Sequence, residues 1–391
     1  MVYIPLSTYR LQLFHGFTFN DAIDVIGYLS DLGIGHVYTS PYLQASPGST
    51  HGYDVVDHNR INEELGGAEA HQRFCKTIQE YGMGHILDIV PNHMAITGGE
   101  NAWWWDVLEN GPSSQYAAYF DVDWTTRENR FANKILLPIL GNHYGRVLEA
   151  GELTITREDE MFQVRYYEHV LPIDPRTIHG ILSQTAAITF NDELAFMANA
   201  FKNLPLPTAT DRESTRQRHR DKEILKKLLK RFFEDNPEIS ATVDSVLNQV
   251  NTDPNALDEI LEGQNYRLAY WRMAGSDLGY RRFFDINSLV GLKVEDETVF
   301  EDTHRLIFRL LEDGLLDGIR IDHPDGLYNP EQYLQRIRQT APNAWVILEK
   351  ILHPGEELRA SWPVQGTVGY DFLNTVNRLF LHADGKEPLT D

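Results

Sequence analysis

Leu316-Asp-Gly-Ile-Arg-Ile-Asp322 and Trp345-Val-Ile-Leu-Glu349 are two short, mainly apolar segments of this 391-residue chain, and each ends on a carboxylate. Both segments have the length and composition of buried strands. In a β/α barrel, the residues at the C-terminal ends of the parallel strands face the active site. We therefore expect Asp322 and Glu349 to lie at one edge of a parallel sheet.

Two carboxylates at such an edge are the usual equipment for cleaving a glycosidic bond. Each also has a simpler interpretation, as a polar residue that starts a loop. Arg320 favours the catalytic interpretation, because side chains at i and i+2 of a strand point to the same side. A guanidinium beside Asp322 would keep that carboxylate ionised, as a nucleophile requires. The apolar strand before Glu349 would bury it and favour its protonated form, as a general acid requires.

The segments on either side of this pair alternate between strand-like and helix-like patterns. Such alternation predicts a parallel sheet with right-handed crossovers. The expected strands are 7–13, 35–40, 85–90, 314–321 and 345–349, and the expected helices are 19–32, 68–81, 301–312, 330–340 and 370–382.

The alternation stops after the third strand, and residues 94–290 are rich first in Trp and turns and then in charged helical patterns. We predict an inserted, mostly helical domain at 94–290, with a long functional rim as the alternative. Residues 1–93 and 291–391 would then be parts of one catalytic barrel. The fold class is α/β, a (β/α)8 TIM barrel of which only about five β/α units are visible.

Asp88-Ile-Val-Pro-Asn92-His93 ends the third expected strand, and His51-Gly-Tyr-Asp54 follows the second. Asp88 and Asn92 have a simpler interpretation, as structural hydrogen-bond partners or as ligands of a hard cation. His93 is either a histidine satisfied within the rim or a donor to a sugar hydroxyl. Tyr53 and Asp54 supply an aromatic face and an acceptor, which together suit a sugar ring.

Two other stretches have competing interpretations. Trp103-Trp104-Trp105 suggests carbohydrate stacking, but core packing is the stronger alternative, since three consecutive residues cannot all face one ligand. Residues 212–231 are rich in Lys and Arg. The apolar residues Ile224, Leu225, Leu228, Leu229, Phe232 and Phe233 predict an amphipathic helix there, with the charges on its solvated face.

Composition limits the possible partners. The formal net charge of −22 argues against binding nucleic acid, because the summed field repels phosphates. Cys75 is the only cysteine, so the chain has neither an intrachain disulfide nor a cysteine-based zinc cluster. It also lacks a Gly-x-x-x-x-Gly-Lys-Ser/Thr phosphate loop and a His-Glu-x-x-His zinc helix, and we expect no cofactor or metal. The N-terminus lacks a signal-peptide pattern, and no apolar run is long enough for a membrane helix. We expect a cytoplasmic protein.

The chain resembles the α-amylase clan of glycoside hydrolases and transglycosidases. Its first three signatures are similar to Asp88–His93, Gly318–Asp322 and Glu349. Within the clan the chain looks most like the maltooligosyl trehalose synthases, a resemblance carried by these runs: Ser7–Gln12, Tyr38–Leu43, Pro47–Asp54, Arg281–Asn287 and Arg320–Leu327. That family continues well beyond this length, and the clan's fourth signature, with a third catalytic aspartate, is expected after residue 391.

The resemblance implies roles for individual residues. Asp322 would be the nucleophile and Glu349 the acid/base. The substrate-binding set would be Tyr53, Asp54, His93, Arg320, His323 and Lys350, and the structural signature set would be Asp88, Asn92, Asp285 and Asn287. For a retaining pair we expect the two carboxyl groups to lie roughly 5–5.5 Å apart.

The implied reaction converts the reducing-end α-1,4 linkage of a maltooligosaccharide to an α,α-1,1 linkage through a covalent glycosyl-enzyme. A trehalohydrolase would be a functional partner. The alternatives are an α-1,4-glucan hydrolase of the amylase or trehalohydrolase type, and an inactive carbohydrate-binding fragment.

Overall fold

The structure is a computed structural model that describes residues 4–125, 132–382 and 385. The chain divides into two compact units, each described here by itself. The first unit comprises residues 1–94 and 292–391, and the second comprises residues 95–291. No helix among the described residues is long and apolar enough to cross a membrane.

The first unit is built on a six-stranded sheet in the order β1-β2-β5-β14-β15-β16, and every neighbouring pair in it is parallel. This order is that of successive strands in a β/α barrel, and the sheet corresponds to part of such a barrel. Its strands are β1 Thr8–Leu11, β2 His36–Thr39, β5 Gly84–Ile89, β14 Gly318–Ile321, β15 Trp345–Leu348 and β16 Gly366–Thr367. The short strands β3 Leu43–Ala45 and β4 Val55–Ile61 form an antiparallel pair, and β6 His93–Ala95 leads into the second unit.

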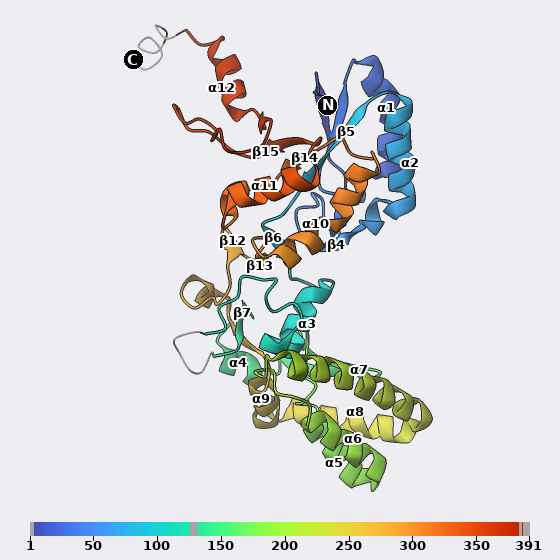
Figure 1. Ribbon diagram of the computed structural model, residues 1–391. Coiled ribbons are helices and arrows are strands. Elements are labelled where there is room, and N and C mark those ends of the chain that lie inside the picture. The colour runs from blue at the N-terminus through green and yellow to red at the C-terminus, as the bar shows by residue number, and fades with distance from the viewer. Residues whose placement is uncertain (1–3, 126–131, 383–384, 386–391) are drawn as a thin grey trace. The chain divides into compact units, whose positions relative to one another are not determined.

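Four helices of this unit, α1, α2, α10 and α11, each bury one apolar stripe, whereas α12 buries no residue and extends away from the sheet (Figure 1). Helix α1 buries Phe19, Ala22, Ile26 and Leu29, and it packs beside α2, which buries Phe74 and Ile78 among others. The helices of this unit are α1 Phe19–Asp31, α2 Gly67–Glu80, α10 Glu297–Glu312, α11 Pro330–Thr340 and α12 Tyr370–Arg378.

The five strands and five helices expected from the sequence are all present in this unit, with shifted ends. Strand β14 begins at Gly318 rather than Gly314, because residues 314–316 turn the chain after α10: Gly314 has φ +67°, and the amides of Leu315 and Leu316 bind the Leu310 carbonyl. Helix α12 ends at Arg378, short of the expected end at His382. The sixth strand, β16, was not predicted, since a two-residue strand carries no periodic signal.

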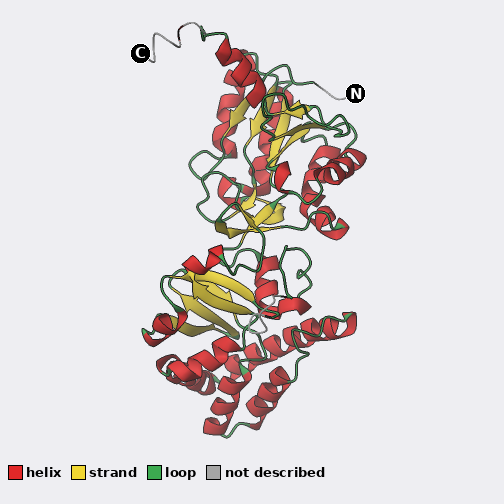
Figure 2. Ribbon diagram, turned by 90° about the vertical axis from the view of Figure 1, so that its left-hand side faces the viewer, coloured by secondary structure: helices red, strands yellow, loops and turns green. Residues whose placement is uncertain are grey.

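The second unit combines small sheets with a layer of helices (Figure 2). Strands β8, β9 and β10 form an antiparallel sheet, β7 pairs in parallel with β11, and β12 is antiparallel to β13. These strands are β7 Ile135–Leu140, β8 Leu153–Glu158, β9 Met161–Tyr166, β10 His169–Pro172, β11 Tyr266–Tyr270, β12 Arg282–Phe283 and β13 Ile286–Gly291. The helices are α3 Ala102–Asn110, α4 Tyr144–Glu149, α5 His179–Thr189, α6 Asp192–Lys202, α7 Arg212–Asp235, α8 Pro237–Thr252 and α9 Pro254–Glu262.

Helix α7 corrects two expectations. Ile224 and Leu228 are 50% and 44% exposed and so lie outside the buried stripe. Arg218 and Lys222 are buried instead of solvated. They are paired with buried carboxylates: Arg218 Nη2 lies 3.0 Å from Asp174, and Lys222 Nζ lies 2.6 Å from Glu109. Buried charges occur in proteins when they are paired in this way.

The run Trp103-Trp104-Trp105 lies in the first turn of helix α3, and two of its rings pack against other aromatic rings. Trp104 is 3% exposed and meets Phe120 edge to face, with ring centroids 5.1 Å apart. Trp103 stacks on Tyr116 at 5.6 Å. For these two side chains the structure favours the packing interpretation over sugar stacking.

Candidate active site

The candidate site of the first unit lies at the carboxyl ends of three adjacent strands. Asp88 is near the end of β5, Arg320 is in β14 with Asp322 directly after it, and Glu349 follows β15. The register of the sheet sets Arg320 beside Asp88. Because parallel strands end at one edge, groups from three distant segments of the chain meet there.

Arg320 holds the three carboxylates together. Its Nη1 lies 2.7 Å from Asp88 Oδ1 and 2.7 Å from Asp322 Oδ1, and its Nη2 lies 3.0 Å from Glu349 Oε1. The contact with Asp322 is the one that strand alternation predicted. The side chains of Arg320 and Asp322 are only 7% and 9% exposed, so these attractions are little screened by water. One guanidinium therefore fixes the positions of both candidate catalytic carboxylates.

Burial works against the ionised form of Asp322. Burial raises the pKa of Asp322 to about 7, and the neighbouring Asp88 and Glu349 charges add to the rise, while the Arg320 guanidinium opposes it. We expected Arg320 to hold this carboxyl ionised, and its guanidinium does lower the pKa of Asp322, but burial and the neighbouring carboxylates outweigh that effect. Arg320 is shared among three carboxylates, so it offsets only part of the desolvation.

The Glu349 side chain is more exposed to solvent than the sequence predicts. Its side chain is 29% exposed, so the apolar strand before it does not bury it. Its Oε2 accepts a hydrogen bond of 3.0 Å from the backbone N–H of His323, whose φ is +44°. The backbone after Asp322 thus orients Glu349, and His323 contacts the site through its main chain.

Asp88 connects strand β2 and the loop that carries Tyr53 to the site by hydrogen bonds. It is buried, and its Oδ2 accepts hydrogen bonds from the hydroxyls of Tyr53 at 2.6 Å and Tyr38 at 2.9 Å. Burial raises the pKa of Asp88 and of both phenols. Arg10 of β1 donates to the Tyr53 hydroxyl at 3.2 Å and lies over the Tyr38 ring.

We assigned no site role to Arg10 or Tyr38 from the sequence. The available signal was strand alternation. Arg10 and Tyr38 are register partners in β1 and β2, at positions that face the same side as Asp88 and Arg320. In this part of the chain the sequence predicted site residues only in the loop that carries Tyr53, and none in strands β1 or β2 themselves.

Tyr53 is held by the loop around it. Gly52 has φ +79°, and a Cβ there would lie 2.2 Å from the Pro41 carbonyl oxygen, so only glycine fits this turn. The His93 ring nitrogen Nε2 lies 3.2 Å from the Tyr53 carbonyl oxygen. Asp54 binds the Ser49 hydroxyl, and it therefore shapes the loop rather than joining the carboxylate cluster. Asn92 is buried against His93, with 3.3 Å between Nδ2 and Nδ1.

The remaining predicted residues make other contacts, each within its own unit. Lys350 Nζ is held by Asp325 at 3.1 Å and by Glu356 at 3.2 Å. Asp285 and Asn287 belong to the second unit, where Asp285 is exposed and the carbonyl oxygen of Asn287 accepts a hydrogen bond from the Tyr280 hydroxyl. Among the described residues no group of three or more His, Cys, Asp or Glu side chains is arranged to hold a metal ion.

Comparisons with known proteins show which families this chain is similar to. The family described as "Alpha amylase, catalytic domain" matches residues 18–146. A relative from Mycobacterium tuberculosis (strain ATCC 25618 / H37Rv) that carries a maltooligosyl trehalose synthase name is 35% identical over 397 residues, which cover 100% of this chain and 40% of the relative. An intracellular maltogenic amylase from Bacillus subtilis (strain 168) is 32% identical over 109 residues, 28% of this chain and 18% of that protein.

Among solved structures, maltooligosyltrehalose synthase from Arthrobacter ramosus is similar with a TM-score of 0.72 and 34% identity, over 99% of this chain and 40% of that one. The parallel sheet and the family match together make residues 18–146 and the strands around them similar to an α-amylase catalytic domain. Within that class the chain is a relative of the maltooligosyl trehalose synthases, which it matches over its whole length. The chain spans about 40% of the length of these relatives.

Proposed function

We propose that this chain carries the bond-breaking part of an intramolecular transglycosylase. Its substrate would be a maltooligosaccharide, whose reducing-end α-1,4 linkage is converted to an α,α-1,1 linkage. The observation that carries the proposal is the single guanidinium of Arg320 that contacts both Asp322 and Glu349. The names of the full-length relatives support the choice of α-glucan and of transfer.

In the first half-reaction Glu349 gives its proton to the glycosidic oxygen while the Asp322 carboxylate attacks C1. The C1–O bond breaks, and an ester joins the sugar to Asp322. A pair that works in this way has carboxyl groups roughly 5–5.5 Å apart, a separation that stays a prediction for this site. Glu349 suits the acid role because its partial exposure lets it reach a bound sugar.

In the second half-reaction the freed glucose attacks the ester through its own C1 hydroxyl. The hydroxyl proton passes to Glu349, and Asp322 leaves as a carboxylate. Water must be excluded for this transfer to compete with hydrolysis. Tyr53, fixed by Asp88 and His93, and Arg320 are the side chains proposed to line the sugar subsite.

Product analysis by NMR after incubation with maltopentaose tests this proposal. A non-reducing product with an α,α-1,1 linkage is the expected result, whereas glucose and maltose indicate a hydrolase and no turnover contradicts the proposal for this chain. Asp322→Asn removes the nucleophile and should abolish turnover. Asp313→Asn is the matched control, because Asp313 is exposed at the end of α10.

The pH profile of that turnover provides a second readout. A nucleophile acts as its ionised form, and the pKa of Asp322 is raised to about 7. The rate should therefore fall as the pH drops through about 7. A rate that stays constant down to about pH 5 would contradict the role of Asp322 or its raised pKa.

A further inference from the structure

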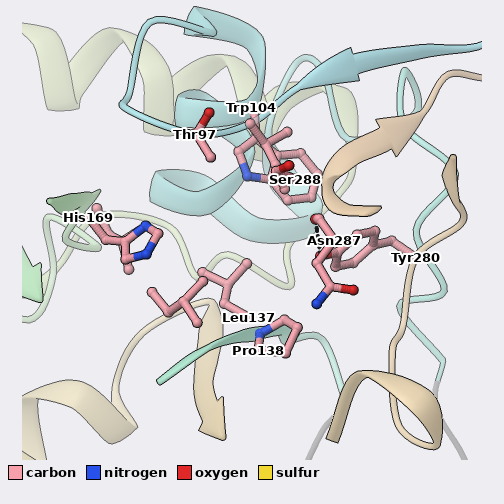
Figure 3. Close-up of a pocket in the computed structure, with 11 residues that line it drawn as sticks. Thr97, Trp104, Leu137, Pro138, His169, Tyr280, Asn287 and Ser288 are labelled. Carbon is pink, nitrogen blue, oxygen red and sulfur yellow. Dashed lines mark hydrogen bonds between the residues drawn. The ribbon is translucent and has the colours of Figure 1, made fainter. Parts of the chain in front are cut away.

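The second unit contains a pocket of about 300 Å³ that uses none of the residues assigned to bond cleavage (Figure 3). Its walls come from the loop after β6, helix α3, strands β7, β10 and β13, and Tyr280. Volumes near this one are at the lower end of those of small-molecule sites. The pocket therefore has room for a small ligand.

One wall is the edge of a strand. Leu137, Pro138 and Ile139 are consecutive residues of β7, and all three line the pocket. Successive side chains of a strand point to opposite faces, so three in a row can border one space only when that space lies along the strand edge. Strand β7 pairs with β11, and in the described part of the chain its other edge has no partner strand. Apolar side chains and main-chain groups thus share this wall.

Polar side chains face this apolar wall. Figure 3 shows Thr97, His169, Asn287 and Ser288 around the hollow, with Leu137 and Pro138 on another side of it. Asn287 is fixed from two directions: the Tyr280 hydroxyl donates to its carbonyl oxygen at 2.8 Å, and Arg282 donates to its amide oxygen. Hydrogen-bonding groups held in place in this way suit a ligand rich in hydroxyls.

The charge of the lining restricts the ligand further. Among the described residues that border the pocket, none is Asp, Glu, Lys or Arg, although such residues make up 24% of the chain. A charged ligand would lose its hydration there, and the guanidinium beside the lining, that of Arg282, is already engaged with the Asn287 amide oxygen. The ligand that fits is neutral, with apolar faces and several hydroxyls, as a hexose ring is.

We propose that this pocket is a sugar-binding site that holds one or two units of a neutral oligosaccharide. The choice of an α-1,4-glucan as the probe rests on the proposed function, but the pocket argument does not. Trp104 closes one wall and is not a stacking platform, because it is 3% exposed and packs against Tyr280 and Phe120. Recognition depends on the polar groups opposite β7.

Hydrogen–deuterium exchange of the whole chain with maltotriose tests the proposal site by site. We expect slower exchange in peptides that contain β7, β10 and β13, with a Kd on the order of 1 mM. Thr97→Val and Asn287→Leu should each raise that Kd about tenfold. Thr208→Val, an exposed threonine of the same unit, is the control and should leave the Kd unchanged. Comparing melting temperatures ensures that any loss comes from the pocket and not from unfolding.

The same experiment separates this inference from the proposed function. Protection confined to peptides around β14 and β15 overturns the pocket and supports sugar binding at the carboxylate site. If exchange in β7, β10 and β13 is still slowed by maltotriose in Asp322→Asn, the pocket is supported independently of the catalytic proposal. Equal protection by glucose 6-phosphate, or unchanged binding in both pocket variants, overturns the inference.

Discussion

Replacing Arg320 by Gln should destabilise the first unit more than any other exchange of one arginine for a neutral residue there. The guanidinium contacts Asp88, Asp322 and Glu349 at 2.7, 2.7 and 3.0 Å, and it is 7% exposed. Removing one partner of a buried ion pair leaves uncompensated charge and costs about 3–5 kcal/mol. We expect a loss of that size in the free energy of unfolding near pH 8.

The loss should shrink as the pH falls. The pKa of Asp322 is raised to about 7 in the folded wild-type protein, where the Arg320 guanidinium opposes the rise. Removing that guanidinium should therefore raise the pKa of Asp322 further. A group with a raised folded pKa contributes stability at low pH and loses that contribution as the pH rises through the folded pKa. Each further unit of rise adds about 1.4 kcal/mol of destabilisation at high pH that is absent at low pH.

Urea unfolding followed by circular dichroism near pH 5.5 and pH 8 measures both effects. Arg336→Gln is the matched control, because Arg336 donates to the backbone carbonyls of Val294 and Glu295 in the same unit. That control should lose about 1 kcal/mol, equally at both pH values. A loss at Arg320 no larger than the control, or one that does not change with pH, would refute the reasoning.

Two further predictions concern the turn before Tyr53 and the second unit. Gly52→Ala should lower the free energy of unfolding by more than about 2 kcal/mol, because its Cβ would meet the Pro41 carbonyl oxygen. Gly355→Ala, which has a similar φ of +84° and open space, should cost only about 1 kcal/mol, and equal losses in urea unfolding would contradict the clash. In the second unit, burial alone would raise the pKa of Glu109, but Lys226 and Lys222 outweigh it and lower that pKa from 4.5 to about 2. The stability that Glu109 contributes is therefore present above about pH 4.5 and is lost as the pH falls to about 2. Glu109→Gln should remove that acid-dependent loss when the free energy of unfolding is measured as a function of pH. An unchanged pH dependence in this variant would contradict the role of Glu109.

Sequence patterns determined the sheet but not the contacts across it. Strand positions follow from short apolar runs between helical stripes, and Arg320 beside Asp322 follows from alternation within one strand. The link between Arg320 and Asp88 depends on the register of β14 against β5, which no local pattern contains. The hydroxyls of Tyr38 and Tyr53 reach Asp88 through the same long-range register.

Burial was the least predictable property. Glu349 follows an apolar strand and is nevertheless partly open, because its position lies beyond the last paired residue of β15. Arg218 and Lys222 occupy a helix dense in charges and are nevertheless buried, because Asp174 and Glu109 come from other segments to pair with them. Helical periodicity describes one face of a helix, and it does not identify the carboxylates that another segment supplies.

Trapping of the glycosyl-enzyme tests the central claim most directly. The protein is incubated with a fluorinated maltosyl fluoride that forms the ester quickly and releases it slowly, and peptide mass spectrometry then locates the sugar. The account predicts one maltosyl group on Asp322, present in the wild type and absent from Asp322→Asn. A sugar attached to any other residue, or an equal adduct in Asp322→Asn, would contradict it.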